Sequence, residues 1–200
     1  MTFKVKDHYF NKAKKDNFLA RSVYKLEEID KKFSIISKGD SIVDLGYHPG
    51  SWVQYCMLKV GEKGSVVGID IKEVNETLGG KPNVSLFQKD IDTVESIADL
   101  GLSDKIDVLL SDMAPNTSGI KSLDQDRSLN LVEKVFELLP LFLKEDGNLV
   151  IKVFDGNGAQ KFLKEKKSLF KEFHFLRPKS TRSVSKEFFV IGKNFRHDRV

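Results

Sequence analysis

Four charged side chains occupy positions in the sequence from which they could do chemistry. Asp70, Asp90 and Asp112 each come at or just after the end of an apolar run, and Lys152 lies inside another such run. Carboxylates accept hydrogen bonds from hydroxyl groups. A lysine, whose pKa is about 10.4 in water, can remove a proton only where its surroundings lower that pKa. The set therefore suits a hydroxyl-bearing ligand and a proton transfer.

A turn with two glycines narrows the choice of ligand. It reads Gly46-Tyr47-His48-Pro49-Gly50 and directly follows an apolar run. The Gly-Lys-Ser/Thr ending of a phosphate-binding P-loop is absent, and so is the Gly-x-Gly-x-x-Gly pattern of a dinucleotide site. S-adenosylmethionine has no phosphate, and it needs a turn that its atoms can approach closely and an acceptor for its ribose hydroxyls. Gly46 and Gly50 supply the turn and Asp70 the acceptor, so the pattern favours this methyl donor.

Apolar runs that alternate with helical patterns predict the elements that hold these side chains. We predict helices over 7–36, 51–58, 123–143 and 159–170, and strands over 41–46, 65–70, 84–87, 106–111, 149–154, 173–176 and 188–191. This alternation indicates an α/β fold, a mostly parallel seven-stranded sheet with helices on both faces. The last two strands have no helix between them, which predicts an antiparallel last strand. Open sheets of this kind bind ligands at the carboxyl ends of their strands, where the turn and the charged residues fall.

Several short motifs, taken together and in order, carry a resemblance over about residues 20–192. They are Arg21-Ser22 with Tyr24-Lys25-Leu26, Val43 to Gly46, Pro49-Gly50 with Trp52 and Gln54, Ser111 to Asn116 with Ser118-Gly119, Val150 to Phe154, and Ser185 to Glu187. In these motifs the chain resembles the FtsJ/RrmJ (RlmE) family of ribosomal RNA ribose 2′-O-methyltransferases. That resemblance implies a Rossmann-like, class I S-adenosylmethionine-dependent methyltransferase fold.

The resemblance also implies site residues. A catalytic Lys-Asp-Lys-Glu tetrad falls on Lys25, Asp112, Lys152 and Glu187, and the cofactor contacts fall on Gly50, Trp52, Asp70, Asp90 and Asp112, to which the turn adds Gly46. We expect Lys152 to act as the base or to orient the acceptor hydroxyl. The two carboxylates would orient the lysines and the ribose. The chain departs from the family pattern at Tyr47, His48 and Ser51, in the turn that would contact the donor.

The substrate that the resemblance implies is a uridine of 23S (large-subunit) ribosomal RNA, methylated on its ribose 2′-oxygen in the assembled 50S subunit. Two alternatives stay open at this stage. One is ribose methylation of a transfer RNA, because related enzymes share the tetrad. The other is a ribosome-assembly factor that binds the donor or RNA without turnover, which the altered turn at Tyr47, His48 and Ser51 keeps possible.

Charge along the chain is divided in a way that suits a polyanionic partner. The net charge of +4 is unevenly distributed. Residues 1–38 carry ten Lys/Arg and five Asp/Glu, residues 39–158 carry eleven and twenty, and residues 159–200 carry twelve and four. Two basic ends around an acidic middle favour contact with RNA phosphates. The residues that we expect to make it are Lys4, Lys6, Lys12, Lys14, Lys15, Arg21, Lys179, Arg182 and Lys186.

Length and composition set the remaining expectations. The 200 residues suit one globular unit, which we divide into a basic N-terminal helical extension, 1–38, and a methyltransferase domain, 39–200. Cys56 is the one cysteine, and the four histidines are scattered without metal-ligand spacing. No apolar run approaches the roughly 18 residues of a membrane span. We therefore expect a cytoplasmic, metal-independent monomer.

Overall fold

A seven-stranded sheet forms the centre of the computed structural model, which describes residues 8–115, 119 and 121–200. The strand order is β3-β2-β1-β4-β5-β7-β6. The strands are β1 (Ser41–Leu45), β2 (Ser65–Asp70), β3 (Val84–Gln88), β4 (Ile106–Ser111), β5 (Leu143–Phe154), β6 (Phe170–Leu176) and β7 (Glu187–Phe195). β1 to β5 pair in parallel, whereas β7 is antiparallel to both of its neighbours. The predicted fold class and the antiparallel last strand are confirmed.

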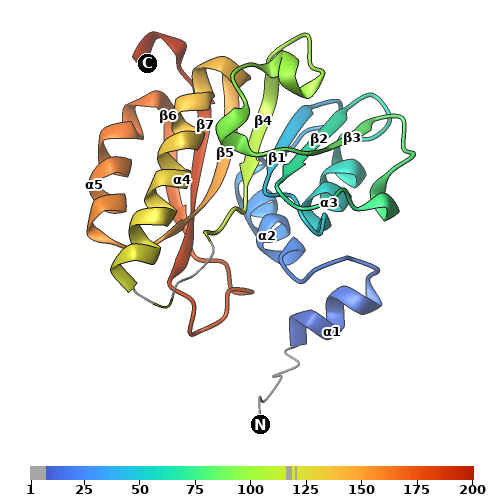
Figure 1. The fold of residues 1–200 in the computed structure, drawn as a ribbon, viewed down its shortest axis with the longest axis horizontal. Coiled ribbons are helices and arrows are strands. Elements are labelled where there is room, and N and C mark those ends of the chain that lie inside the picture. The colour runs from blue at the N-terminus through green and yellow to red at the C-terminus, as the bar shows by residue number, and fades with distance from the viewer. Residues whose placement is uncertain (1–7, 116–118, 120) are drawn as a thin grey trace.

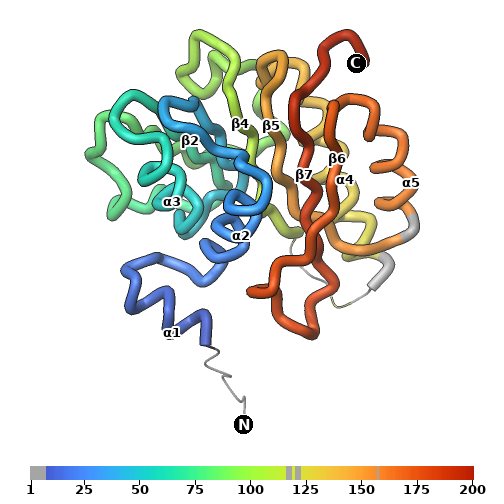
Figure 2. Tube along the Cα trace, turned by 180° about the vertical axis from the view of Figure 1, so that it is seen from behind, coloured from blue at the N-terminus to red at the C-terminus, as the bar shows by residue number. Residues whose placement is uncertain are grey.

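Helices cover both faces of this sheet (Figure 1). They are α1 (His8–Lys15), α2 (Val23–Phe33), α3 (Ser51–Val60), α4 (Lys121–Phe142) and α5 (Asn157–Lys166), with short 3₁₀ helices η1 (Glu76–Leu78), η2 (Ile91–Thr93), η3 (Ile97–Leu100), η4 (Lys167–Leu169) and η5 (His197–Arg199). The view from behind shows α2 and α3 in front of the strands, with α4 on the other side (Figure 2). The sheet is thus the middle of three layers.

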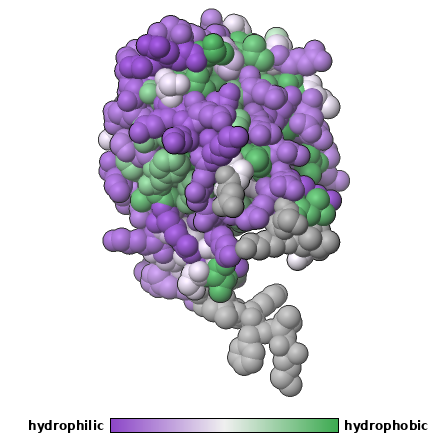
Figure 3. All heavy atoms as spheres, turned by 90° about the vertical axis from the view of Figure 1, so that its left-hand side faces the viewer, coloured by the Kyte–Doolittle hydropathy of each residue, from purple (hydrophilic) through white to green (hydrophobic). Residues whose placement is uncertain are grey.

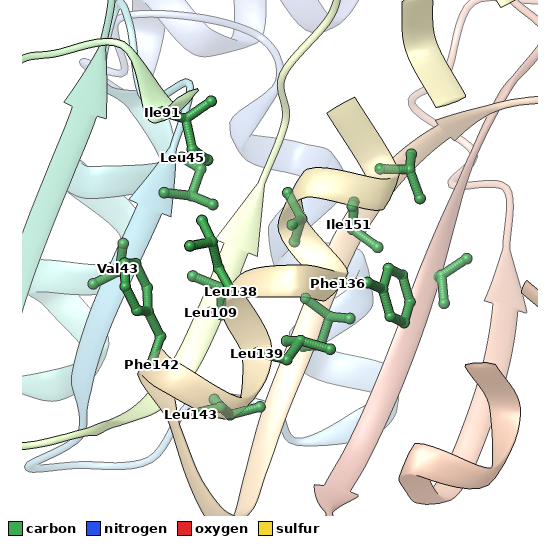
Figure 4. Close-up of a cluster of buried hydrophobic side chains, with 14 of the residues drawn as sticks. Val43, Leu45, Ile91, Leu109, Phe136, Leu138, Leu139, Phe142, Leu143 and Ile151 are labelled. Carbon is green, nitrogen blue, oxygen red and sulfur yellow. The ribbon is translucent and has the colours of Figure 1, made fainter. Parts of the chain in front are cut away.

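Alternate residues of each strand enter different cores, as the two-residue period of a strand requires. Val43, Leu109 and Ile151 pack with α4 in one buried cluster, which Figure 4 shows from close by. Their sequence neighbours Ile42, Leu110 and Val150 pack with α2 and α3 in a second buried cluster. Both faces of the central strands are therefore apolar, which is why the strands appear in the sequence as continuous apolar runs.

The predicted helix over 7–36 is wrong in one respect, because it is two helices. Asn17 has a left-handed φ of 59°, and the Phe18 N–H donates to the Ala13 carbonyl at 2.8 Å, which closes the last turn of α1. The Leu19 N–H then donates to the Gln54 side chain at 2.8 Å. Contacts with α3, which the local pattern does not reveal, break the helix here.

The other boundaries differ from the prediction mainly in length. β5 begins at Leu143 instead of residue 149, because that end pairs with Ile106 of β4 through an irregular register. Asp146, with φ of 62°, lies in this irregular part. β2 and β4 have the predicted bounds. The longer strand extends the sheet at its amino edge and leaves the carboxyl edge as predicted.

The helix α2 is built into the body of the molecule. Val23, Leu26 and Ile29 recur at three-residue spacing, are at most 1% exposed and belong to the same buried cluster as the strands. The helix ends where Ser34 takes a left-handed conformation, its N–H donating to the Asp30 carbonyl. The division at residue 38 into a helical extension and a methyltransferase domain stays a prediction.

The surface around α5 and the outer strands is mostly hydrophilic (Figure 3). Within residues 8–115, 119 and 121–200, the structure contains no helix that is long and apolar enough to span a membrane. α1 and the loop that joins β6 to β7 extend from the same, lower edge of the molecule in Figures 1 and 2. This is the carboxyl edge, because β6 runs in the same direction as β5.

Candidate active site

Lys152 and Asp112 form a buried ion pair at the carboxyl edge of the sheet. Asp112 directly follows β4, and Lys152 lies on the adjacent strand β5. The Lys152 Nζ lies 2.9 Å from an oxygen of the Asp112 carboxylate and donates to the Asp112 backbone carbonyl at 2.5 Å. Lys152 is 8% exposed. Two contacts to one residue fix the ammonium group at the point where the central strands end.

Lys25 and Glu187 form a second ion pair, between α2 and the start of β7. The Lys25 Nζ lies 2.5 Å from a carboxylate oxygen of Glu187, and the two side chains are only 12% and 11% exposed. The same ammonium lies 5.6 Å from the centre of the Phe189 ring. The contact joins α2 to β7, the last strand in the sequence.

The strand register places the two ion pairs next to each other. Lys152 pairs with Phe189 and Phe154 pairs with Glu187 across the β5–β7 ladder. Because strand side chains alternate, Lys152 and Glu187 are diagonal neighbours on one face of the sheet. Phe189 belongs to the buried cluster under α2, so this is the face that α2 covers. The four residues predicted as a catalytic tetrad are brought to one place, and their roles stay predictions.

A cavity of about 690 Å³ opens beside this cluster. Four of the residues predicted to bind the cofactor line it, namely Gly46, Asp70, Asp90 and Asp112. Asp112 therefore belongs both to the cavity wall and to the ion pair with Lys152. The cavity and the charged cluster meet at this one carboxylate.

Gly50 and Trp52, also predicted to contact the cofactor, are not among the residues that line the cavity. The Trp52 indole N–H donates to the Ser22 carbonyl at 2.9 Å, and its ring lies 5.9 Å from that of Phe189. Gly50, with φ of 112°, caps the start of α3. The side chain of Trp52 thus packs between α2, α3 and the sheet.

Asp70 and Gly46 shape the turn at the mouth of the cavity. The two carboxylate oxygens of Asp70 accept the backbone N–H groups of His48 and Lys72, each at 3.0 Å. Gly46 has φ of 75°, and a Cβ atom there would lie 3.1 Å from the Met113 Cα. Only glycine takes this conformation at little cost, and it lets the loops after β1 and β4 approach each other.

Of the three unusual turn residues, His48 alone lines the cavity. Tyr47 is 3% exposed and its ring packs over Gly68 of β2, where a Cβ atom would come within 2.8 Å of the ring. The Ser51 hydroxyl lies 2.9 Å from that of Ser22. His48 Nδ1 is buried without a hydrogen-bond partner among the described residues. An unpaired nitrogen in the cavity wall fits a polar ligand.

Sequence reasoning missed other residues at this site. Arg127 and Asn130 reach the cavity wall from α4, and no motif marks them. Asp44 is fully buried, with both carboxylate oxygens unpaired among the described residues. Burial, followed by the nearby charges of Asp112 and Asp70, raises the pKa of Asp44 well above its usual value. Its position in the Val43 to Gly46 motif was the available signal.

The basic C-terminal loop is held against α2. Arg21 donates to the Ser180 carbonyl, and the Lys179 N–H donates to the Glu28 carboxylate at 2.9 Å. Arg177 donates to the carbonyls of Arg182, Ser183 and Ser185. The two basic ends of the chain therefore meet beside the Lys25–Glu187 pair. Of the predicted motif and phosphate-contacting residues, Lys4, Lys6, Asn116 and Ser118 lie outside the described residues.

No group of three or more His, Cys, Asp or Glu side chains is arranged to hold a metal ion in the part of the chain that the structure describes. The two lysines and two carboxylates of the predicted tetrad are engaged with each other in pairs. What the site offers is a pair of ammonium groups, a pair of carboxylates and an adjoining polar cavity.

Comparisons with known proteins agree with this arrangement. The family model of the FtsJ-like methyltransferases matches residues 18–195. A Bdellovibrio bacteriovorus protein named ribosomal RNA large subunit methyltransferase E is 42% identical, with 96% of this chain and 98% of that protein covered. A Brachyspira hyodysenteriae protein of the same name is 40% identical, with 96% and 97% covered.

Among solved structures, that of a Plasmodium falciparum protein described as a ribosomal RNA methyltransferase is 29% identical and superposes with a TM-score of 0.77, covering 89% of this chain and 98% of that one. The matched residues 18–195 contain both ion pairs and the cavity described above. The chain belongs to the FtsJ-like methyltransferase family.

Proposed function

We propose that this protein transfers a methyl group from S-adenosylmethionine to the ribose 2′-oxygen of a uridine in 23S (large-subunit) ribosomal RNA, in the assembled 50S subunit. The observation that carries the proposal is the buried Lys152–Asp112 pair, in which the Asp112 carboxylate lines the large cavity and holds the Lys152 Nζ at 2.9 Å. The names of the relatives at 40–42% identity support ribosomal RNA of the large subunit as the substrate.

The cavity residues fit the methyl donor. The volume of the cavity, about 690 Å³, lies within the range of roughly 300–1,000 Å³ that is usual for small-molecule sites. Asp70 and Asp90 would accept hydrogen bonds from ribose hydroxyls and the adenine amino group, and His48 Nδ1 is a polar atom in need of a partner. When bound, the donor supplies a methyl group already activated by a sulfonium centre.

The chain then has to orient the acceptor hydroxyl and manage its proton. Lys152 is the residue that we assign to the 2′-oxygen, where its Nζ holds the hydroxyl in line and, as the neutral amine, accepts the hydroxyl proton. Asp112 fixes that Nζ through its carboxylate and its carbonyl. Fixing the reacting oxygen within about 3–3.5 Å of the carbon it attacks accounts for a large part of the rate in such displacements.

Lys25 and Glu187 complete the site from the other side. Their ion pair holds α2 against β7 and places a second ammonium group beside the position of the ribose. We assign Lys25 to the sugar-phosphate next to the reacting oxygen, and Glu187 to the orientation of Lys25. Both assignments depend on the diagonal neighbourhood of Lys152 and Glu187 across the β5–β7 ladder.

RNA reaches this edge over the two basic segments. Lys14 and Lys15 are exposed on α1, and the loop after β6 brings Lys179, Arg182 and Lys186 to the same edge. Phosphate contacts of this kind position the RNA without reading its sequence.

Ribose-methylation mapping tests the proposal directly. Large ribosomal subunits from cells that lack the protein are incubated with the chain and S-adenosylmethionine, and all RNA is then mapped for 2′-O-methylation. We expect one new 2′-O-methyluridine in the large-subunit RNA. Methylation of a transfer RNA instead, or of no RNA, would refute the proposal.

A further inference from the structure

A second cavity, of about 440 Å³, lies at the carboxyl end of β5, where α4 and α5 begin. Its wall includes Phe154, the last residue of β5, and Asp155, which follows it, together with Gln125 and Asp126 from α4, Gln160 from α5, and Lys186. Among the described residues, it shares none with the wall of the larger cavity. The predicted tetrad and the cofactor contacts leave this cavity without a role.

We infer that this second cavity receives the nucleobase of the nucleotide whose ribose is methylated, with the Phe154 ring as its stacking surface. The inference rests on the proposed function and adds to it a site for the base. Unstacked bases of RNA are characteristically recognised by aromatic rings and by hydrogen bonds to the base edge. This cavity offers both.

The position of Phe154 relative to Lys152 supports the assignment. The two residues point to the same face of β5, because they are two positions apart, and the Lys152 Nζ lies 5.9 Å from the centre of the Phe154 ring. In a nucleotide the base and the 2′-hydroxyl are carried by adjacent ribose carbons. A 2′-oxygen at Lys152 therefore brings its own base to Phe154, while the larger cavity lies on the Asp112 side.

The charges of the second cavity favour a base over a phosphate. Asp126 and Asp155 contribute two carboxylates to the wall, against the single ammonium of Lys186. This balance repels a phosphate group, whereas carboxylate oxygens accept hydrogen bonds from the N–H groups of a neutral base. The amides of Gln125 and Gln160 add groups that can donate and accept.

The rim of the cavity is already ordered around Asp155. Its N–H donates to the Lys186 carbonyl at 3.1 Å. Its carbonyl accepts the Gln125 side-chain amide at 2.8 Å, and its carboxylate accepts that of Gln160, also at 2.8 Å. One residue thus joins the starts of α4 and α5 to the segment before β7, and a preformed site of this kind binds at a lower entropic cost.

Site-directed cross-linking tests the inference. Cys56 is fully buried, so the thiol of a Gln160→Cys variant can be labelled selectively with a photoactivatable azidophenyl group. The labelled protein is illuminated on large ribosomal subunits from cells lacking the chain, and the cross-linked nucleotides are mapped. Lys63→Cys, at an exposed site before β2 and hence at the amino edge of the sheet, is the matched control.

We expect the Gln160→Cys protein to cross-link to the methylated nucleotide and the Lys63→Cys protein not to do so. Cross-links confined to other nucleotides, while the unsubstituted chain methylates its target, would overturn the inference and leave the proposed function intact. Absence of methylation by the unsubstituted chain would overturn both.

A substitution series at Phe154 gives a second readout. Loss of stacking in Phe154→Leu should raise the KM for the ribosomal subunit about tenfold, whereas Phe154→Tyr, which keeps an aromatic ring, should stay close to the unsubstituted protein. The Kd for S-adenosylmethionine should be unchanged in both variants. A parallel loss of donor affinity, or equal KM values for both variants, would contradict a role in holding the base.

Discussion

Lys25 and Glu187 come from opposite ends of the chain, yet their charged groups lie 2.5 Å apart on the face of the sheet that α2 covers. The contact exists because α2 packs in one buried cluster with residues of β1, β5 and β7, and because β7 is inserted between β5 and β6. It joins the basic N-terminal segment to the strand beside Lys152.

Replacing Lys152 should stop methyl transfer without weakening the binding of the methyl donor. Lys152→Ala removes the group that we assign to the acceptor proton, and loss of such a group costs roughly 10²- to 10⁴-fold in rate. Donor affinity, measured by calorimetry, should stay close to its original value because Lys152 does not line that cavity. Lys171→Ala, which removes an exposed Lys–Asp pair at the opposite end of the sheet, is the control. Turnover close to normal in Lys152→Ala would exclude the role.

Replacing Asp70 should have the opposite pattern. Asp70→Asn removes the charge of the carboxylate that lines the donor cavity. Because hydrogen bonds to charged groups contribute roughly 1.5–3 kcal/mol, the donor Kd should rise about 10- to 100-fold. RNA affinity, measured by filter binding, should change little. Asp104→Asn, at an exposed aspartate away from the cavity, is the control; equal loss of both affinities in Asp70→Asn would argue against a donor contact.

The Lys25–Glu187 pair should show energetic coupling in a double-mutant cycle. The two side chains are only 12% and 11% exposed, so removing one partner leaves a largely buried charge. Lys25→Met and Glu187→Gln should therefore each lower the free energy of unfolding, and the double variant should lose less than the sum of the two single losses. We expect a coupling free energy of roughly 1–3 kcal/mol. The more exposed Lys144–Asp107 pair, at 2.8 Å, should give about 0–1 kcal/mol. Additive single variants at Lys25 and Glu187 would mean that the pair does not stabilise the fold.

The raised pKa of Asp44 predicts a stability that falls as the pH rises. Between the unfolded value, about 3.9, and the higher pKa of the folded state, the native protein keeps a proton that the unfolded chain has lost. The free energy of unfolding therefore decreases with pH in this window. In urea titrations within this pH window, the free energy of unfolding of Asp44→Asn should rise relative to that of the unsubstituted protein by about 1.4 kcal/mol per pH unit. A pH-independent difference for Asp44→Asn would contradict a protonated Asp44.

Binding of ribosomal RNA should depend steeply on salt, through the exposed lysines of α1. Each phosphate contact to single-stranded RNA contributes about 0.7 to the slope of log affinity against log salt. Lys15→Ala should therefore reduce that slope by about this amount, whereas Lys63→Ala, at the amino edge, should leave it unchanged. A flat response between about 50 and 200 mM salt would rule out docking through these charges.

The sequence by itself determined the sheet, the site edge and the candidate residues. β2 and β4 were predictable to the residue because strands buried on both faces are continuous apolar runs bounded by charged or turn residues. The carboxyl-edge positions of Asp70, Asp112 and Lys152 followed from the strands that carry them. The resemblance added Lys25 and Glu187, which no local pattern distinguishes from ordinary residues of a charged helix and a strand start.

The tertiary structure decided what depends on contacts between distant segments. It broke the N-terminal helix at Asn17, because α3 supplies hydrogen bonds that compete with the next helical turn. It turned Tyr47 into the core over Gly68 and left His48 in the cavity. It also formed the second cavity around Asp155 from α4, α5 and the segment before β7. Local periodicity carries no information about these contacts between distant segments, because the free energy that stabilises them comes from packing across the sheet.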